Sequence, residues 1–172
     1  MIVEQHKLDA LANALFQVLE RTGEGLVLAE SCTAGLIAAS LARVPGMSRR
    51  LAGSYVVYQI DSKVRWLAVP ADIIQQYGVV SREVAASMAM QALIQTPHAN
   101  IAMSITGHLG PDAPPELDGR AWLSIVRRGS EAVAVPLRLK SESGDDALRC
   151  RHHRQADAVH QALATLLGEL QD

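Results

Sequence analysis

The stretch GLVLAESCTAGLIAASLARVPG, residues 25–46, decides the fold because a strand pattern passes directly into a helix pattern. Its first residues, GLVLA (25–29), form an apolar run as short as a buried strand. Residues 34–43 then carry apolar side chains at helical spacing until Val44-Pro45-Gly46 ends them. The two patterns are joined by ESCT (30–33), four polar or reactive side chains at the point where a strand meets a helix. Either one of these side chains caps the helix, or the four side chains belong to an active site.

The rest of the chain alternates between helix and strand patterns in the same way. Apolar residues recur at helical spacing, and strand-like runs are bounded by turn residues. The expected helices are 8–19, 34–43, a short one starting at Asp61, 71–78, 82–95 and 145–170, and the expected strands are 25–29, 51–58, 99–106 and a hairpin of 121–126 and 131–139. This order predicts an α/β fold, a three-layer α/β/α sandwich with a mostly parallel mixed sheet, in a single domain over residues 1–172.

The composition is that of an ordinary soluble protein, with 49% hydrophobic and 20% charged residues and a net charge of −2. This charge gives no electrostatic reason to expect nucleic acid or a membrane surface as a partner. The two cysteines form no CxxC pair, which fits a reducing compartment. We expect no signal peptide and no membrane-spanning run, and therefore a cytoplasmic protein. The oligomeric state stays open, a homo-oligomer included.

The polar residues after two of the expected strands predict where a ligand binds. In open α/β sheets ligands bind at the carboxyl ends of strands, and Ser104, Thr106 and Gly107 close the second strand as ESCT closes the first. A helix beginning near Thr33 would offer free N–H groups to a phosphate or an oxyanion. Ser31 would then be a nucleophile beside them, or Ser31 or Thr33 would simply cap the helix. Cys32 is either a rival nucleophile or a small buried side chain.

A serine nucleophile needs a base, and the sequence offers Lys63. This lysine follows Tyr58 by five residues, just past an expected strand. A lysine near apolar walls can lose its proton near neutral pH, and a tyrosine can relay or hold that proton. The alternative is a surface lysine with a tyrosine at the edge of the core. The histidines of the last helix have no acidic partner at ligand spacing, so no metal site is expected.

Several motifs resemble one known family. ESCTAG (30–35), YVVYQIDSK (55–63), SITGHLGP (104–111) and GRAW (119–122) look like the C-terminal domain of the competence/damage-inducible protein CinA, which also occurs alone as nicotinamide mononucleotide deamidase. The resemblance implies a single CinA C-terminal-like domain and an amidohydrolase of pyridine nucleotide salvage. Such an enzyme converts the amide of a small nucleotide substrate to the acid plus ammonia, with no cofactor. It implies Ser31, Tyr58 and Lys63 as catalytic residues, and as substrate-binding residues Glu30, Cys32, Thr33, Gly35, Thr106, Gly107, His108 and Arg154, with Arg151 close by.

The chain departs from the family pattern around these residues. Ala34 stands in place of a glycine, Ile60 in place of an asparagine, and His108-Leu109 in place of Ile-Ala. The segment DAPPELDG (112–119) replaces a glycine-rich tail, and its prolines remove N–H donors and stiffen the loop. His108 would replace a lost substrate contact or close the pocket. Besides the deamidase, two interpretations stay open: an amidohydrolase with another substrate, and a non-catalytic paralogue that binds a nucleotide or a protein.

Overall fold

The computed structural model describes residues 5–142, 144 and 146–171 and has one five-stranded mixed sheet between helices. The strands are β1 (Leu26–Glu30), β2 (Leu51–Val56), β3 (Ile101–Gly107), β4 (Arg120–Arg127) and β5 (Val133–Arg138). The helices are α1 (Gln5–Thr22), α2 (Leu36–Ala42), α3 (Ile60–Arg65), α4 (Ala71–Tyr77), α5 (Arg82–Gln95) and α6 (Ala147–Gln171), with a 3₁₀ turn at Met47–Arg49.

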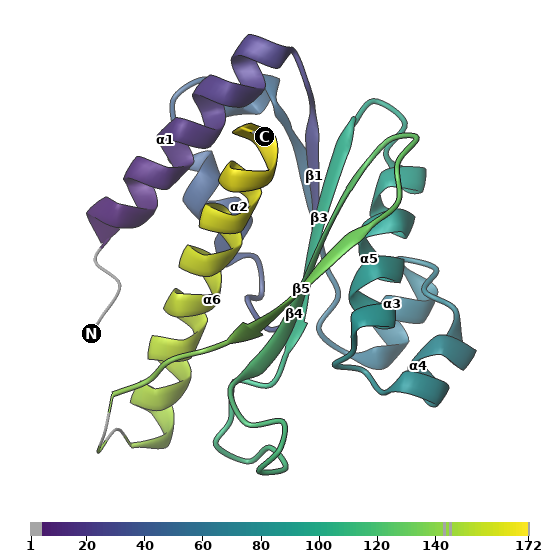
Figure 1. The fold of residues 1–172 in the computed structure, drawn as a ribbon, viewed down its shortest axis with the longest axis vertical. Coiled ribbons are helices and arrows are strands. Elements are labelled where there is room, and N and C mark those ends of the chain that lie inside the picture. Colours follow the sequence, from purple (N-terminus) through teal and green to yellow (C-terminus); the bar gives the residue numbers. More distant parts are fainter. Residues whose placement is uncertain (1–4, 143, 145, 172) are drawn as a thin grey trace.

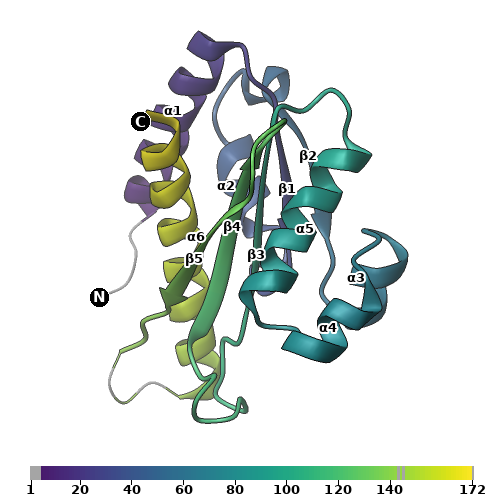
Figure 2. The same ribbon diagram turned by 45° about the vertical axis from the view of Figure 1, so that its right-hand side comes forward.

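The sheet has the order β2-β1-β3-β4-β5. Strands β2, β1 and β3 are parallel, whereas β4 runs antiparallel to both β3 and β5, so four of the five strands share one direction. Helices α1, α2 and α6 cover one face and α3, α4 and α5 cover the other (Figures 1 and 2). The predicted three-layer α/β/α sandwich is therefore confirmed. None of the helices within the described residues is long and apolar enough to cross a membrane.

The core lies on both faces of the sheet because successive strand residues point to opposite sides. Leu26 and Leu28 of β1 pack in the cluster formed with α1, α2 and α6, while Val27 and Ala29 pack in the cluster under α5. Burial on both faces explains why β1 is continuously apolar rather than alternating. The same alternation directs the next side chain, Glu30, toward α2.

Several element boundaries differ by a few residues from those expected from the sequence, and two of these differences bear on the site. The helix expected over 34–43 begins at Leu36, because Ala34 and Gly35 have φ of 52° and 94° and form a left-handed turn before it. The strand expected over 51–58 ends at Val56, and the Val57 N–H donates instead to the Glu30 carbonyl oxygen at 2.8 Å. Both differences lie beside Ser31, where the backbone leaves regular structure.

Candidate active site

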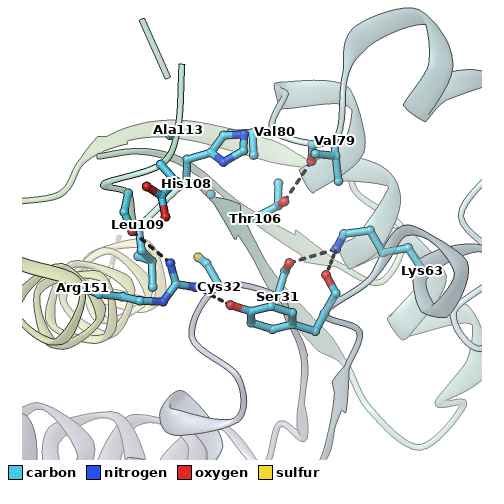
Figure 3. A pocket seen from close by; sticks show the side chains of 14 residues that line it. Ser31, Cys32, Lys63, Val79, Val80, Thr106, His108, Leu109, Ala113 and Arg151 are labelled. Carbon is cyan, nitrogen blue, oxygen red and sulfur yellow. Dashed lines mark hydrogen bonds between the residues drawn. The ribbon is translucent and has the colours of Figure 1, made fainter. Parts of the chain in front are cut away.

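A cavity of about 270 Å³ opens at the carboxyl ends of β1 and β3. From β1 the chain passes to β2 on one side, while β3 lies on the other, so the cavity sits where the strand order reverses. Ser31 enters it after β1, His108 after β3, and Lys63 from α3 (Figure 3). The side chains brought together here come from segments that are far apart in the sequence.

Ser31 and Lys63 are in direct contact. The Lys63 Nζ atom lies 2.9 Å from Ser31 Oγ, 2.8 Å from the Val57 carbonyl oxygen and 3.4 Å from the Tyr58 carbonyl oxygen. The lysine side chain is fully buried. A neutral amine has two N–H donors and one lone pair. The ammonium form donates to all three oxygens, Ser31 Oγ included, whereas the neutral amine can keep its two donors on the carbonyl oxygens and turn its lone pair to the serine hydroxyl.

Burial also sets the proton affinities in this cavity. It lowers the pKa of Lys63 from 10.5 to about 8, against a smaller opposing effect of the Cys32 thiol. Burial likewise raises the pKa of Cys32 to about 12, so the thiol stays protonated near neutral pH. Cys32 lines the cavity next to Ser31 (Figure 3), but a protonated thiol is a poor nucleophile. Of the two adjacent candidates, Ser31 is the one in hydrogen-bond contact with an amine.

Glu30 lies beneath α2 rather than in the cavity. Its carboxylate accepts hydrogen bonds from the N–H groups of Gly35, Ile37 and Ala38 at 3.0–3.1 Å, and from the Ser54 hydroxyl at 3.0 Å. A buried carboxylate at this end of a helix satisfies donors that would otherwise be orphaned. The expectation that the helix offers free N–H groups to a substrate is wrong, because Glu30 occupies them.

The turn after Ser31 is not a side-chain helix cap. Among the described residues, the Ser31 hydroxyl contacts Lys63 and the Thr33 hydroxyl contacts no polar group, so neither caps the start of α2. Thr33 is fully buried, does not line the cavity, and its hydroxyl has no hydrogen-bond partner among the described residues. Gly35 is also outside the cavity wall. Across the described part of the chain, no acceptor on another residue is recorded for the N–H groups of Cys32 and Thr33.

The opposite wall comes from β3 and the loop after it. Thr106, Gly107 and His108, which were expected to bind substrate, all line the cavity. The Thr106 hydroxyl donates to the Val79 carbonyl oxygen at 2.9 Å, which ties β3 to the chain entering α5. A Cβ on Gly107 would lie 2.5 Å from that of Ala121, so β4 packs here only against a glycine.

The two arginines of α6 have different places. Arg154 forms a two-pronged ion pair with Asp118 at 2.6 and 2.7 Å, donates to the Leu109 carbonyl oxygen at 3.1 Å, and does not line the cavity. Arg151 does line it and contacts the Tyr58 hydroxyl and, at 3.1 Å, the Gly110 carbonyl oxygen (Figure 3). Arg154 therefore anchors the loop, and Arg151 is the arginine that a ligand can reach.

Tyr58 stands at the mouth of the cavity, half exposed. Within the described residues, its hydroxyl has no hydrogen bond to Ser31 or Lys63, and only its carbonyl oxygen approaches the lysine. The expected proton relay through the phenol thus has no direct contact to support it. Leu109 and Gly110, from the SITGHLGP motif, and Asp112 and Ala113, from the altered segment after it, also line the cavity. Val79 and Val80, which were not candidate site residues, line it as well, because the fold brings the chain before α5 to this place.

Comparison with known proteins shows which family the chain belongs to. A family model described as the CinA C-terminal domain matches residues 8–170. The chain belongs to this family. It is 39% identical over 124 residues to a CinA-like protein of Citrifermentans bemidjiense, covering 71% of this chain and 30% of that protein. It is 40% identical over 141 residues to a CinA-like protein of Myxococcus xanthus, and the match covers 80% of this chain and 32% of that protein. The chain thus spans about a third of the length of these relatives.

Solved structures of the family match over nearly the whole chain. A competence/damage-inducible protein, CihA, from Agrobacterium tumefaciens superposes with a TM-score of 0.86 at 29% identity, covering 100% of this chain and 99% of that one. A CinA superfamily protein from Escherichia coli superposes with a TM-score of 0.83 at 28% identity, covering 97% and 92%. The expected family membership is confirmed.

Proposed function

We propose that the chain is an amidohydrolase that converts the amide of nicotinamide mononucleotide to the acid and ammonia. One observation carries the proposal: a serine hydroxyl lies 2.9 Å from a buried lysine amine, at the wall of a cavity. The pKa of that amine, lowered to about 8, keeps part of it unprotonated near neutral pH. Membership in the CinA C-terminal domain family, which includes nicotinamide mononucleotide deamidases, supports the choice of substrate.

The first half of the reaction forms an ester on Ser31. Its Oγ attacks the amide carbon, its proton passes to Lys63 Nζ, and the carbonyl electron pair moves to oxygen. When this tetrahedral species collapses, the carbon–nitrogen bond breaks. The Lys63 ammonium returns its proton to the leaving nitrogen, which departs as ammonia.

The second half releases the acid. Water attacks the ester carbon and gives its proton to Lys63, which is neutral again after the first half. The bond between carbon and Ser31 Oγ then breaks, and the lysine returns the proton to the serine oxygen. Lys63 serves as base and then as acid in each half, so its pKa should lie close to the working pH.

The walls of the cavity suit a ring at depth and an anionic group outside. Val79 and Val80 supply apolar surface beside Thr106. Arg151 lies across the cavity from Lys63 (Figure 3), and two of its five N–H donors are used by Tyr58 and Gly110. We assign its remaining donors to the substrate phosphate, because a guanidinium binds phosphate through several N–H groups at once.

Ammonia release from nicotinamide mononucleotide tests the proposal. Ser31→Ala should lower turnover by several orders of magnitude and leave the circular dichroism spectrum unchanged, because loss of a serine nucleophile costs up to about 10⁶ in rate. Cys32→Ser, one residue away, is the control and should stay within about tenfold of wild type. Activity of Ser31→Ala near that of wild type contradicts the mechanism. If the enzyme releases ammonia only from another pyridine amide, that amide replaces nicotinamide mononucleotide as the proposed substrate. If it releases ammonia from none of them, the result favours a binding protein.

A further inference from the structure

His108 is a half-buried histidine of the cavity wall that the mechanism above does not use. It follows the last residue of β3, and its backbone N–H donates to the Arg120 carbonyl oxygen at 2.9 Å, so the pairing of β3 with β4 continues for one more residue. Because side chains alternate along a strand, His108 points to the same side as Thr106. Both line the cavity, and the His108 ring lies across it from Ser31 (Figure 3).

The ring of His108 is available to a ligand. Other polar side chains of the wall already have partners: Ser31 and Lys63 bond to each other, and the Thr106 hydroxyl donates to the chain before α5. Within the described residues, no hydrogen bond is recorded for the side chains of His108 and Asp112, although both line the cavity. The imidazole can therefore donate to a ligand without giving up a hydrogen bond inside the protein.

The charges of the wall favour an anionic ligand. Lys63, His108 and Arg151 can each carry a positive charge, and they surround the cavity on three sides (Figure 3). The one carboxylate among the described lining residues belongs to Asp112, which is exposed, so solvent screens its charge. An anionic group between His108 and Arg151 would meet N–H donors from two different elements, the loop after β3 and helix α6.

We propose that His108 is a specificity-determining residue that binds, together with Arg151, the phosphate of a mononucleotide substrate. The assignment rests on the proposed amide hydrolysis, in which the amide carbon lies at Ser31 and the far end of the substrate meets the other walls. An imidazole keeps at least one N–H donor in either protonation state, and a guanidinium offers several to the same phosphate. His108 thus acts on the choice of substrate rather than on the chemical step.

The expected effect is a loss of preference for the phosphorylated ligand. This preference is the Kd of nicotinamide riboside, which lacks the phosphate, divided by the Kd of nicotinamide mononucleotide. A hydrogen bond to a charged group contributes roughly ten- to a hundredfold in affinity. His108 is only half-buried, so its removal should lower the preference by about tenfold, the low end of this range. The affinity for the riboside should change little.

The test measures both affinities by calorimetry in Ser31→Ala protein, which should bind without turnover. His108→Leu keeps most of the side-chain volume and removes the donors, whereas His108→Gln restores an N–H donor. Asp112→Asn is the matched control, because Asp112 lies in the same loop and also lines the cavity. Ammonia release from nicotinamide mononucleotide by wild type is measured separately and reports on the proposed function.

The proposal is supported if the preference falls by about tenfold in His108→Leu, returns to within about threefold in His108→Gln, and does not fall in Asp112→Asn. It is overturned if His108→Leu weakens both ligands equally, as a residue that only closes the pocket would, or if Asp112→Asn loses the same preference. It is also overturned if the Ser31→Ala protein binds the mononucleotide no more tightly than the riboside. If His108→Leu does not fold, His108→Phe takes its place with the same expected loss.

Failure of the proposed function gives a different result. In that case wild type releases no ammonia, while the preference for the phosphorylated ligand and its loss in His108→Leu are still measured by calorimetry. The phosphate contact would then belong to a binding protein, so the two failures are distinguishable.

Discussion

Burial of Lys63 should make the stability of the protein depend on pH in a defined way. The lysine is fully buried in the fold, and this burial lowers its pKa from 10.5 to about 8. Because one pKa unit corresponds to about 1.4 kcal/mol, keeping the lysine charged in the folded state costs about 3 kcal/mol. Lys63→Met, a neutral side chain of similar length, removes this titration.

The sign follows from proton binding. Below about pH 8 the lysine is protonated in the folded and the unfolded protein, and the full cost applies. Between about pH 8 and 10.5 the unfolded chain binds more protons than the folded one, so the free energy of unfolding of wild type rises with pH. Relative to Lys63→Met, wild type should therefore gain about 3 kcal/mol between pH 7 and 10.5.

Urea unfolding of both proteins at several pH values measures this difference, and groups that titrate in both cancel. Lys140→Met, at an exposed lysine, is the control, and its free energy of unfolding should change with pH as that of wild type does. In the activity assay, kcat/KM should rise with pH through a midpoint near 8, because only the neutral amine accepts the serine proton. Lys63→Arg should be inactive, since arginine keeps its proton. The argument from burial is refuted if the difference in free energy of unfolding between wild type and Lys63→Met does not change with pH, or if the midpoint of kcat/KM lies near pH 10.5.

Four further substitutions are informative. Ala34→Gly should raise the free energy of unfolding by about 1 kcal/mol because φ is 52° there. Glycine at the exposed helical Ala39 should lower it by about 1 kcal/mol, and urea unfolding checks both signs. Asp118→Asn weakens the ion pair with Arg154 that anchors the loop and should raise KM more than it lowers kcat; an unchanged KM would contradict this. Tyr58→Phe should also act mainly on KM, whereas a kcat loss beyond about 100-fold would favour the proton relay after all.

The sequence predicted well what depends on near neighbours along the chain. The apolar run 25–29, the helical stripe after it and the alternation of later elements indicated a layered α/β sandwich, because side-chain periodicity follows directly from backbone geometry. Ser31 and Lys63 became candidates from their places after expected strands, and the family resemblance then favoured them over a helix cap and a surface lysine. The sequence did not predict the first residue of α2, because nothing in the local pattern indicates that Ala34 and Gly35 have positive φ values.

Only the tertiary structure decided what these side chains touch. Glu30 and Arg154 were both expected to bind substrate. Glu30 instead accepts hydrogen bonds from the backbone of α2, and Arg154 pairs with Asp118, 36 residues away. Gln155 reaches the turn after Ser31 across more than 120 residues. Such pairings arise from the way whole helices pack on the sheet. The sequence by itself thus indicated the fold class and the two candidate residues Ser31 and Lys63, while the packing of α2 and α6 determined which groups surround them and which face the cavity.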